Sequence, residues 1–203
     1  LVNREKQVVW RLGEEKPSHI LHLERPQCVE LSEREDSEVL VTDTDQHRVL
    51  RIYRPTKEVI WQYGEKGVMG SRPGLLGHPR SALVTPQDTV LITDQYSGRV
   101  IEVDPSGDII WQFGGWDNGV NPLNAPYYAE LTTDDTVLIT DWSNHYVIEA
   151  NRAGEIIWQY GTLKNPGNGP HQLMYPERAN RLLNGNTLIV DTRNHRVIEV
   201  DPA

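Results

Sequence analysis

Short runs of apolar, β-branched residues recur along the whole chain and are separated by Gly, Pro, Asn and Asp. Runs such as TVLITD (89–94) and RVIEVD (99–104) have the length and composition of β-strands, and no run has the length and spacing of a helix. Over one stretch of the chain the pattern predicts four antiparallel strands joined by tight turns, at 80–84, 89–93, 99–103 and 108–113. The chain is therefore predicted to be all-β.

The runs repeat with a period of about 50 residues. Three markers keep this period: Trp10, Trp61, Trp111 and Trp158; Asp43, Asp94, Asp141 and Asp191; and Pro26, Pro79, Pro126 and Pro176. Four short antiparallel strands per repeat, here named strands a to d, are typical of a β-propeller blade. We predict a single domain of four four-stranded blades, with repeats at 14–64, 65–114, 115–161 and 162–203. The repeated Trp is expected to fill the wedge between blades.

The phase of the repeat predicts how the two ends meet. The chain opens with a strand-d sequence within 1–13, and the last repeat stops after strand c. Pairing the N-terminal strand with the last blade would close a ring of four blades and cover two sheet edges. This closure favours a monomer. Because the two ends overlap by a few residues, two alternatives stay open: two chains forming an eight-bladed ring, or a piece of a larger propeller without an independent site.

Composition limits which partners and which cellular compartments are expected for this chain. The 29 acidic and 20 basic residues give a formal net charge of −9, so nucleic acid is not an expected partner. Cys28 is the only cysteine, which excludes an internal disulfide and a thiolate metal cluster. No apolar run approaches the roughly 18 residues that cross a bilayer, and the chain begins with too many charges for a signal peptide. We expect a soluble protein, either cytoplasmic or exported, that does not insert into membranes.

The turn after the repeated Asp carries a resemblance to a known family. It reads DWSNHYVIEAN at 141–151 and DTRNHRVIEVDP at 191–202, and Gly-rich linkers such as 64–79 lead into each repeated Pro. In these features the whole chain resembles the NHL-repeat family, which implies a β-propeller. The family includes ligand-binding domains, protein-interaction domains and some enzymes, so the resemblance implies no single function.

A weaker resemblance is to the propeller of bacterial arylsulfotransferases, through NGNTLIVDTRNHRVIEVDP and GEIIWQYG. That resemblance would imply a His at the head of strand a. The residues that follow the repeated Pro are instead Gln27, Arg80, Tyr127 and Glu177.

The repeated Asp and the His that follows it are interpreted as structural. An Asp that ends a strand can accept backbone N–H bonds from the next turn, and a fourfold motif is unlike a single active site. The His occurs at His47, His145 and His195 but is Gly98 in the second repeat, which favours turn packing. The alternative is that these three His bind a divalent metal ion for hydrolase or lyase chemistry, although no local metal-binding spacing is present.

Propeller topology places the b–c turns and the d–a linkers on one face, named the top face. All seven His map to it, whereas acidic turns such as 32–38 map to the opposite face. Aromatic residues give a large contact area at small entropic cost. We therefore predict a binding or scaffolding module for a protein or a small ligand, with no required cofactor, and name as alternative an enzyme that uses top-face His. The predicted contact residues are Trp116, Trp142, Tyr96, Tyr127, Tyr128, Arg80, Glu177 and Arg178.

Overall fold

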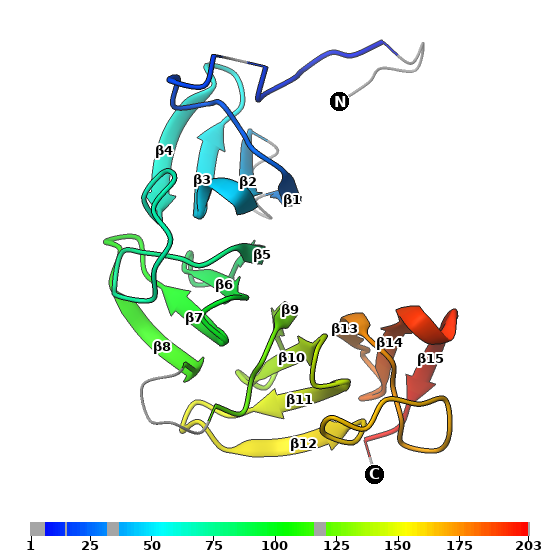
Figure 1. Ribbon diagram of the computed structural model, residues 1–203. Coiled ribbons are helices and arrows are strands. Elements are labelled where there is room, and N and C mark those ends of the chain that lie inside the picture. Colours follow the sequence, from blue (N-terminus) through cyan, green and yellow to red (C-terminus); the bar gives the residue numbers. More distant parts are fainter. Residues whose placement is uncertain (1–6, 15, 32–36, 116–120, 203) are drawn as a thin grey trace.

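Four antiparallel sheets form an open arc in the computed structural model of this chain, which describes residues 7–14, 16–31, 37–115 and 121–202 (Figure 1). Blade 1 contains β1 (Pro26–Leu31), β2 (Glu38–Asp43), β3 (Arg48–Tyr53) and β4 (Glu58–Tyr63). Blade 2 contains β5 (Pro79–Val84), β6 (Val90–Asp94), β7 (Arg99–Val103) and β8 (Ile109–Gly114). Blade 3 contains β9 (Pro126–Leu131), β10 (Val137–Asp141), β11 (Tyr146–Ala150) and β12 (Ile156–Tyr160). Blade 4 contains β13 (Pro176–Arg181), β14 (Thr187–Asp191) and β15 (Arg196–Val200).

The all-β prediction is confirmed, and the predicted strands of the second repeat agree with β5 to β8 to within one residue at each end. Strands pair in chain order within each blade, with strand a on the inner side of the arc (Figure 1). Short 3₁₀ turns, Thr44–Gln46 and Thr192–Asn194, follow strand b in blades 1 and 4. No helix in the described part of the chain is long and apolar enough to cross a membrane.

The structure differs from the expected ring closure. Blade 4 has three strands among the described residues, and the N-terminal segment lies at the other end of the arc, against blade 1 (Figure 1). Trp10 and Leu12 pack there on the core of blade 1, and the indole N–H of Trp10 donates a hydrogen bond to the carbonyl oxygen of Arg54 at 3.0 Å. The segment is thus held by the first blade and does not supply a fourth strand to the last.

The apolar cores lie between successive blades, as the repeated Trp predicted. Trp61 packs against the core shared by blades 1 and 2, Trp111 lies in the core shared by blades 2 and 3, and Trp158 packs against the core shared by blades 3 and 4. Trp10 takes the corresponding place in front of blade 1. The guanidinium carbon of Arg54 lies 5.8 Å from the ring centroid of Trp10, as that of Arg152 lies 5.6 Å from Trp111.

The repeated Asp fastens its blade to the linker that precedes it. Asp94 Oδ1 accepts the backbone N–H of Gly77 at 2.6 Å, and Asp94 Oδ2 accepts Nε–H of Arg99 at 2.8 Å. The carboxylates of Asp43 and Asp191 bond to the matching linker N–H and Arg of their own blades. The predicted bond from the backbone of the following turn is present at Asp141, which accepts it from Asn144.

The repeated His occupies a backbone position that requires positive φ. The φ angles are 56° at His47, 59° at His145 and 53° at His195, and Gly98 has 60° at the same place. Gly adopts this region without steric cost, which explains the exchange between His and Gly. The two imidazoles at blade junctions also accept a backbone N–H of the next blade at Nδ1, His47 from His78 at 3.3 Å and His145 from Tyr175 at 3.1 Å. These contacts support the structural interpretation.

Candidate functional site

Every strand a begins with a β-bulge. Pairing with strand b skips one residue after the first Pro, and the skipped residues are Gln27, Arg80, Tyr127 and Glu177. A bulge leaves the extra residue out of the ladder and redirects its side chain. Because strand a lies on the inner side of the arc (Figure 1), the bulges place four different side chains at the inner edge of the propeller. The inner edge therefore carries a different type of side chain in each blade.

Two arginines of this inner edge stack on tyrosine rings of a neighbouring blade. The guanidinium carbon of Arg80 lies 3.9 Å from the ring centroid of Tyr127. That of Arg178 lies 4.4 Å from Tyr128, and Arg178 Nη2 donates to the Tyr128 hydroxyl at 3.1 Å. Neither arginine forms an ion pair with another described residue. Two oriented cations thus lie on the inner edge without an ion-pair partner among the described residues.

Arg80 is the less satisfied of the two. Its Nε is buried without a hydrogen-bond partner among the described residues. Burial, followed by the positive charge of Arg25, lowers the pKa of Arg80, whereas Glu177 favours its charged form from beyond ion-pair distance. A guanidinium keeps its proton at neutral pH despite such a shift. Arg80 therefore offers hydrogen-bond donors and a positive charge to an approaching ligand.

The flank around Arg178 is saturated by internal contacts. Asn180 accepts a hydrogen bond from Arg178 Nε at 3.1 Å and donates one to the Glu130 carboxylate. Glu130 also accepts the backbone N–H of Arg181. Burial raises the pKa of the Glu130 carboxyl and that of the Tyr128 hydroxyl. This network holds Tyr128 and Arg178 in place.

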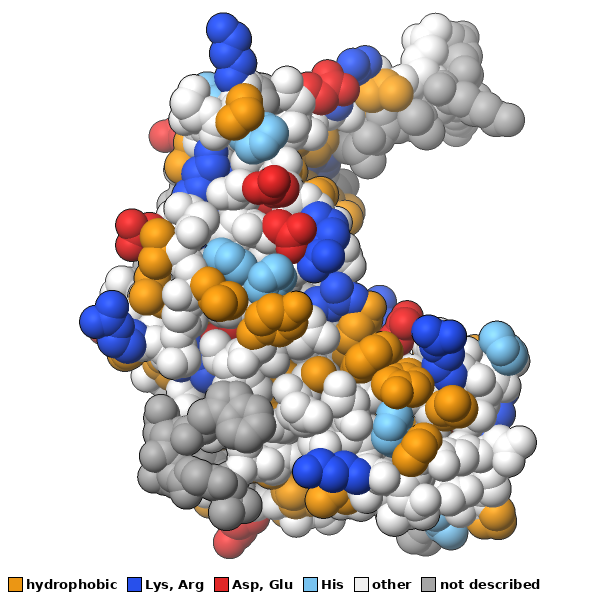
Figure 2. Space-filling view, in the orientation of Figure 1, with side chains coloured by type: hydrophobic (Ala, Val, Ile, Leu, Met, Phe, Trp, Pro, Cys, Tyr) orange, Lys and Arg blue, Asp and Glu red, His pale blue; other side chains and the backbone are white. Residues whose placement is uncertain are grey.

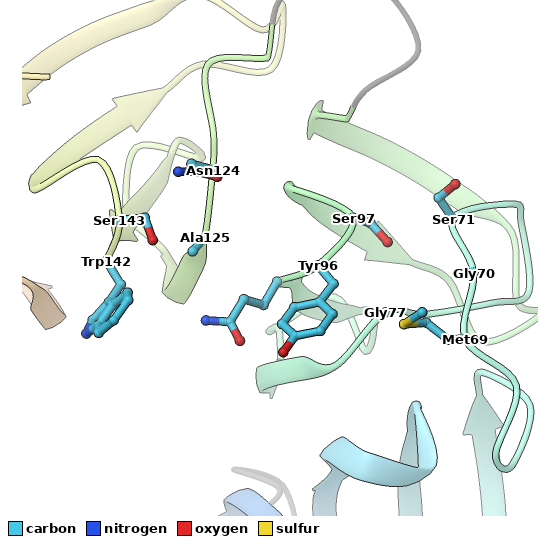
Figure 3. Close-up of a pocket in the computed structure, with 11 residues that line it drawn as sticks. Met69, Gly70, Ser71, Gly77, Tyr96, Ser97, Asn124, Ala125, Trp142 and Ser143 are labelled. Atoms are coloured by element: carbon cyan, nitrogen blue, oxygen red, sulfur yellow. The ribbon is translucent and has the colours of Figure 1, made fainter. Parts of the chain in front are cut away.

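A groove of about 750 Å³ opens between the b–c turns of blades 2 and 3 (Figure 3). Tyr96 from blade 2 and Trp142 from blade 3 lie on its two sides, and Ser143 and Asn124 lie on the Trp142 side (Figure 3). Every lining residue is uncharged. Tyr96 is 62 % exposed and lies close enough to Arg80 to influence its pKa. The groove thus joins an aromatic, neutral surface to the cationic inner edge.

Two ring clusters support the aromatic walls of the groove. Behind Tyr96, His78 stacks on the phenol ring with centroids 4.2 Å apart and meets His47 edge-on at 4.6 Å. Burial is the main cause that lowers the pKa of both imidazoles. With an ordinary value near 6.5, the two rings are mostly neutral at pH 7. They give Tyr96 a backing of flat rings, and His78 Nδ1 lies 3.3 Å from the Asp45 carboxylate, which does not line the groove.

The second cluster is built in the same way at the junction of blades 3 and 4. The ring centroid of Tyr175 lies 4.3 Å from that of Trp142 and 4.5 Å from that of His145. Burial lowers the pKa of His145. Figure 2 shows hydrophobic and His side chains gathered in a band across this face of the arc. The predicted enrichment of the top face is therefore visible on the surface.

The structure brings the predicted contact residues together only in part. Tyr96 and Trp142 line the groove, whereas Arg80, Tyr127, Tyr128, Glu177 and Arg178 belong to the inner edge. Trp116 lies outside the described residues. The proposed metal ligands His47, His145 and His195 lie in three different blades, and the described part of the chain contains no group of three His, Cys, Asp or Glu side chains placed to hold a metal ion.

Sequence reasoning missed the polar lining of the groove, of which Gln95 and Asn124 are examples. Gln95 occupies the same turn position in blade 2 as Trp142 does in blade 3. Alignment of the repeats therefore contained the signal for Gln95. The repeated bulge had no comparable signal, because register is a property of the paired strands.

No family model and no curated protein matches this sequence. Solved structures match it in fold. They include a streptogramin B lyase (TM-score 0.63, 14 % identity, covering 87 % of this chain and 51 % of that one). A Bacteroides caccae protein of unknown function gives a TM-score of 0.65 and 16 % identity, covering 98 % and 63 %. The WD40 β-propeller domain of Doa1 gives a TM-score of 0.62 and 13 % identity, and the match covers 86 % of this chain and 50 % of that one.

These similarities show a β-propeller-like fold and nothing finer. This chain spans between half and two thirds of the length of the three solved chains. Its four blades therefore correspond to part of each of those propellers.

Proposed function

We propose that this protein is a binding module whose inner edge and adjoining groove recognise a ligand with a negative charge on a planar, apolar body. The observation that carries the proposal is the position of Arg80, which is stacked on Tyr127, has no ion-pair partner among the described residues and lies beside the neutral aromatic groove. A propeller of the NHL type is part of this proposal, since the resemblance accounts for the repeat and for the Gly-rich linkers.

The charge of the ligand follows from the state of Arg80. Stacking on Tyr127 holds the guanidinium plane in one orientation, so little side-chain entropy is lost when an anion binds. A hydrogen bond to a charged group contributes roughly 1.5–3 kcal/mol. The negative net charge of −9 opposes the approach of anions in general, so recognition depends on local placement of the positive charge.

The planar body follows from the groove. Trp and Tyr offer large, rigid contact surfaces at low entropic cost, and the lining contains no charged group that would favour a highly charged ligand there. Amides and hydroxyls such as those of Asn124 and Ser143 can orient polar edges of the ligand. A peptide carrying an aromatic side chain beside a carboxylate has this chemistry, as does a small aromatic acid.

The test compares 2-naphthoate with the uncharged 2-naphthamide, by quenching of tryptophan fluorescence. We expect the carboxylate to bind more tightly, and Arg80→Gln to raise its Kd about tenfold or more while leaving Kd for the amide unchanged. Trp142→Ala should raise the Kd of both ligands. Arg193→Gln is the matched control, because Arg193 is an exposed arginine of the blade 4 turn. Equal affinity for acid and amide, or an Arg80→Gln variant that binds both as the unaltered chain does, contradicts the proposal.

The enzymatic alternatives have less support. The described residues hold no group of side chains placed to bind a metal ion, so no observation favours a metal-dependent hydrolase or lyase. An arylsulfotransferase-like activity would use a His at the head of strand a, and the bulge there presents Arg80 or Tyr127 instead. The similarity to streptogramin B lyase is one of fold at 14 % identity.

A further inference from the structure

Blade 4 exposes a face that the other blades bury. In blades 2 and 3 the strand-c residues Val100 and Val147 face the next blade and have 0 % exposure, whereas the equivalent Val197 of blade 4 is 60 % exposed. The strand-b residue Leu188 is 37 % exposed, while its counterpart Leu91 is 2 % exposed. This face has the composition of a blade junction and lacks the blade that would cover it among the described residues.

A polar group at the rim of that face lacks the hydrogen-bond partner that its counterpart in blade 1 has. In blade 1 the hydroxyl of Thr44 donates to the carbonyl oxygen of Pro79, the first residue of strand a in blade 2, at 2.8 Å. Its counterpart in blade 4 is Thr192, whose Oγ1 is buried without a hydrogen-bond partner among the described residues. Pro26 holds the place of Pro79 at the start of blade 1. The group that Thr192 lacks is thus present at the other end of the arc.

The repeated His bonds to the next blade in blades 1 and 3 but not in blade 4. His47 and His145 each accept the N–H of the residue that precedes strand a of the next blade. His195 is exposed and makes no such bond among the described residues. The residue that precedes strand a in blade 1 is Arg25, which has φ 51°, close to the 53° of His78 and Tyr175. Arg25 therefore carries the matching N–H.

A charge pair repeats across the junctions as well. Glu102 of blade 2 pairs with Arg152 of blade 3. In the repeat, Glu199 of blade 4 holds the position of Glu102, and Arg54 of blade 1 holds that of Arg152. Within its own blade, Glu199 accepts hydrogen bonds from the side chains of Asn184 and Asn186. The repeat thus places an acidic residue on blade 4 and a basic residue on blade 1 at the positions that pair between blades 2 and 3.

We propose that blade 4 docks onto blade 1 of a second copy of this chain, with residues 7–12 of that copy pairing with β15 as its fourth strand. Trp10 already occupies the strand-d place in front of blade 1, so the segment that would pair with β15 is held at the blade 1 end of the arc. Blades 1 and 4 of one chain lie at opposite ends of the arc (Figure 1), which favours a second copy over closure within the chain. Two copies joined head to tail make a closed, twofold ring of eight blades.

The test is light scattering on the 203-residue chain over a range of concentrations. We expect the mass of two chains. Val197→Glu should give the mass of one chain with an unchanged circular dichroism spectrum, because the substituted residue is already exposed within the single chain. Ile157→Glu is the matched control, since Ile157 is exposed on the outer strand of blade 3, away from the junction, and should leave the dimer intact. A single-chain mass for the unaltered protein at every concentration, or a mass above two chains, overturns the proposal.

Charge reversal gives a second, independent measurement. Glu199→Arg and Arg54→Glu should each raise the dissociation constant of the dimer at least about tenfold, because like charges then meet at both junctions. Mixing the two single variants should restore the dimer. One junction of the mixed ring then contains the native pair and the other contains the reversed pair. Failure of the mixture to associate better than either variant alone contradicts the proposed junction even if the unaltered chain is dimeric.

Discussion

The Nδ1 atom of His145 accepts a hydrogen bond from the backbone N–H of Tyr175 at 3.1 Å, and this contact joins blade 3 to blade 4. His145 also has a φ of 59°, so one residue both shapes its turn and fixes the next blade. The same arrangement of His47 and His78 joins blades 1 and 2. Blade junctions in this protein therefore depend on a few side chains that project from tight turns.

Replacing His145 separates these two roles. His145→Gly keeps the backbone conformation and loses the hydrogen bond, so we expect the free energy of unfolding to fall by about 1 kcal/mol. His145→Val adds a β-branched side chain at positive φ and should lower it by a further ~1 kcal/mol or more. Urea denaturation of both variants measures the difference. Equal losses for the two variants would show that the backbone conformation contributes nothing.

The buried or half-buried imidazoles at the blade junctions make stability depend on pH. Burial lowers the pKa of His47, His78 and His145, so below about pH 6.5 the unfolded chain takes up protons that the folded chain does not. The stabilisation is fully present above about pH 6.5 and is lost as the pH falls toward the lower pKa of the folded state. Thermal unfolding between about pH 7.5 and pH 5.5 should therefore show a falling Tm.

The control for this pH effect is the double variant His47→Gln, His145→Gln. Its Tm should fall less over the same pH range, because two of the shifted groups are absent. Subtracting the two profiles also removes the contribution of buried carboxyls such as Asp43, whose pKa is raised by burial. Parallel profiles would mean that these His do not titrate differently in the folded and unfolded chains.

Asp94 should be among the most sensitive polar residues. It is fully buried and accepts hydrogen bonds from Gly77 N–H and from Arg99. Asp94→Ala leaves the Arg99 guanidinium buried without its partner and should cost about 3–5 kcal/mol. Asp94→Asn should cost less, since the amide oxygen still accepts one bond. Asp104→Ala, at an exposed turn of the same blade, serves as control and should cost less than about 1 kcal/mol.

Trp111 tests the wedge-filling role of the repeated Trp. It is 9 % exposed within the core between blades 2 and 3, so Trp111→Ala should lower the free energy of unfolding by about 3–5 kcal/mol. The neighbouring Ile110 is 55 % exposed on the same strand. Ile110→Ala should change it by about 0.5 kcal/mol or less. Denaturant titration of the two variants measures both free energies of unfolding. Similar losses of stability in the two variants would contradict a core role for Trp111.

The sequence predicted the strands well because their signals are local. The run TVLITD and its flanking turns identify β6 to within one residue. Asp94 was interpreted as a structural residue bonded to the turn that follows it, whereas its main partners in the structure are the N–H of Gly77 in the linker and the guanidinium of Arg99 in strand c. A repeat shows which residues are equivalent, and it does not show what each of them touches.

Ring closure could not be predicted in the same way. The strand-d sequence around Trp10 is recognisable, but its neighbour in space depends on the curvature of the whole arc. Curvature is the sum of small rotations between blades, and it is set by side-chain volumes in the cores. The groove beside Tyr96 is likewise a product of two turns from different blades. Neither feature is encoded in a single repeat.

The bulge at the start of each strand a separates ligand recognition from folding. The residue in the bulge takes no part in the strand register, so Gln27, Arg80, Tyr127 and Glu177 can be exchanged while the pairing of strands a and b is preserved. A combinatorial library restricted to these four positions would vary the inner edge on a constant scaffold. By the same reasoning, divergence at these positions changes the chemistry of the inner edge while the register of strands a and b is preserved.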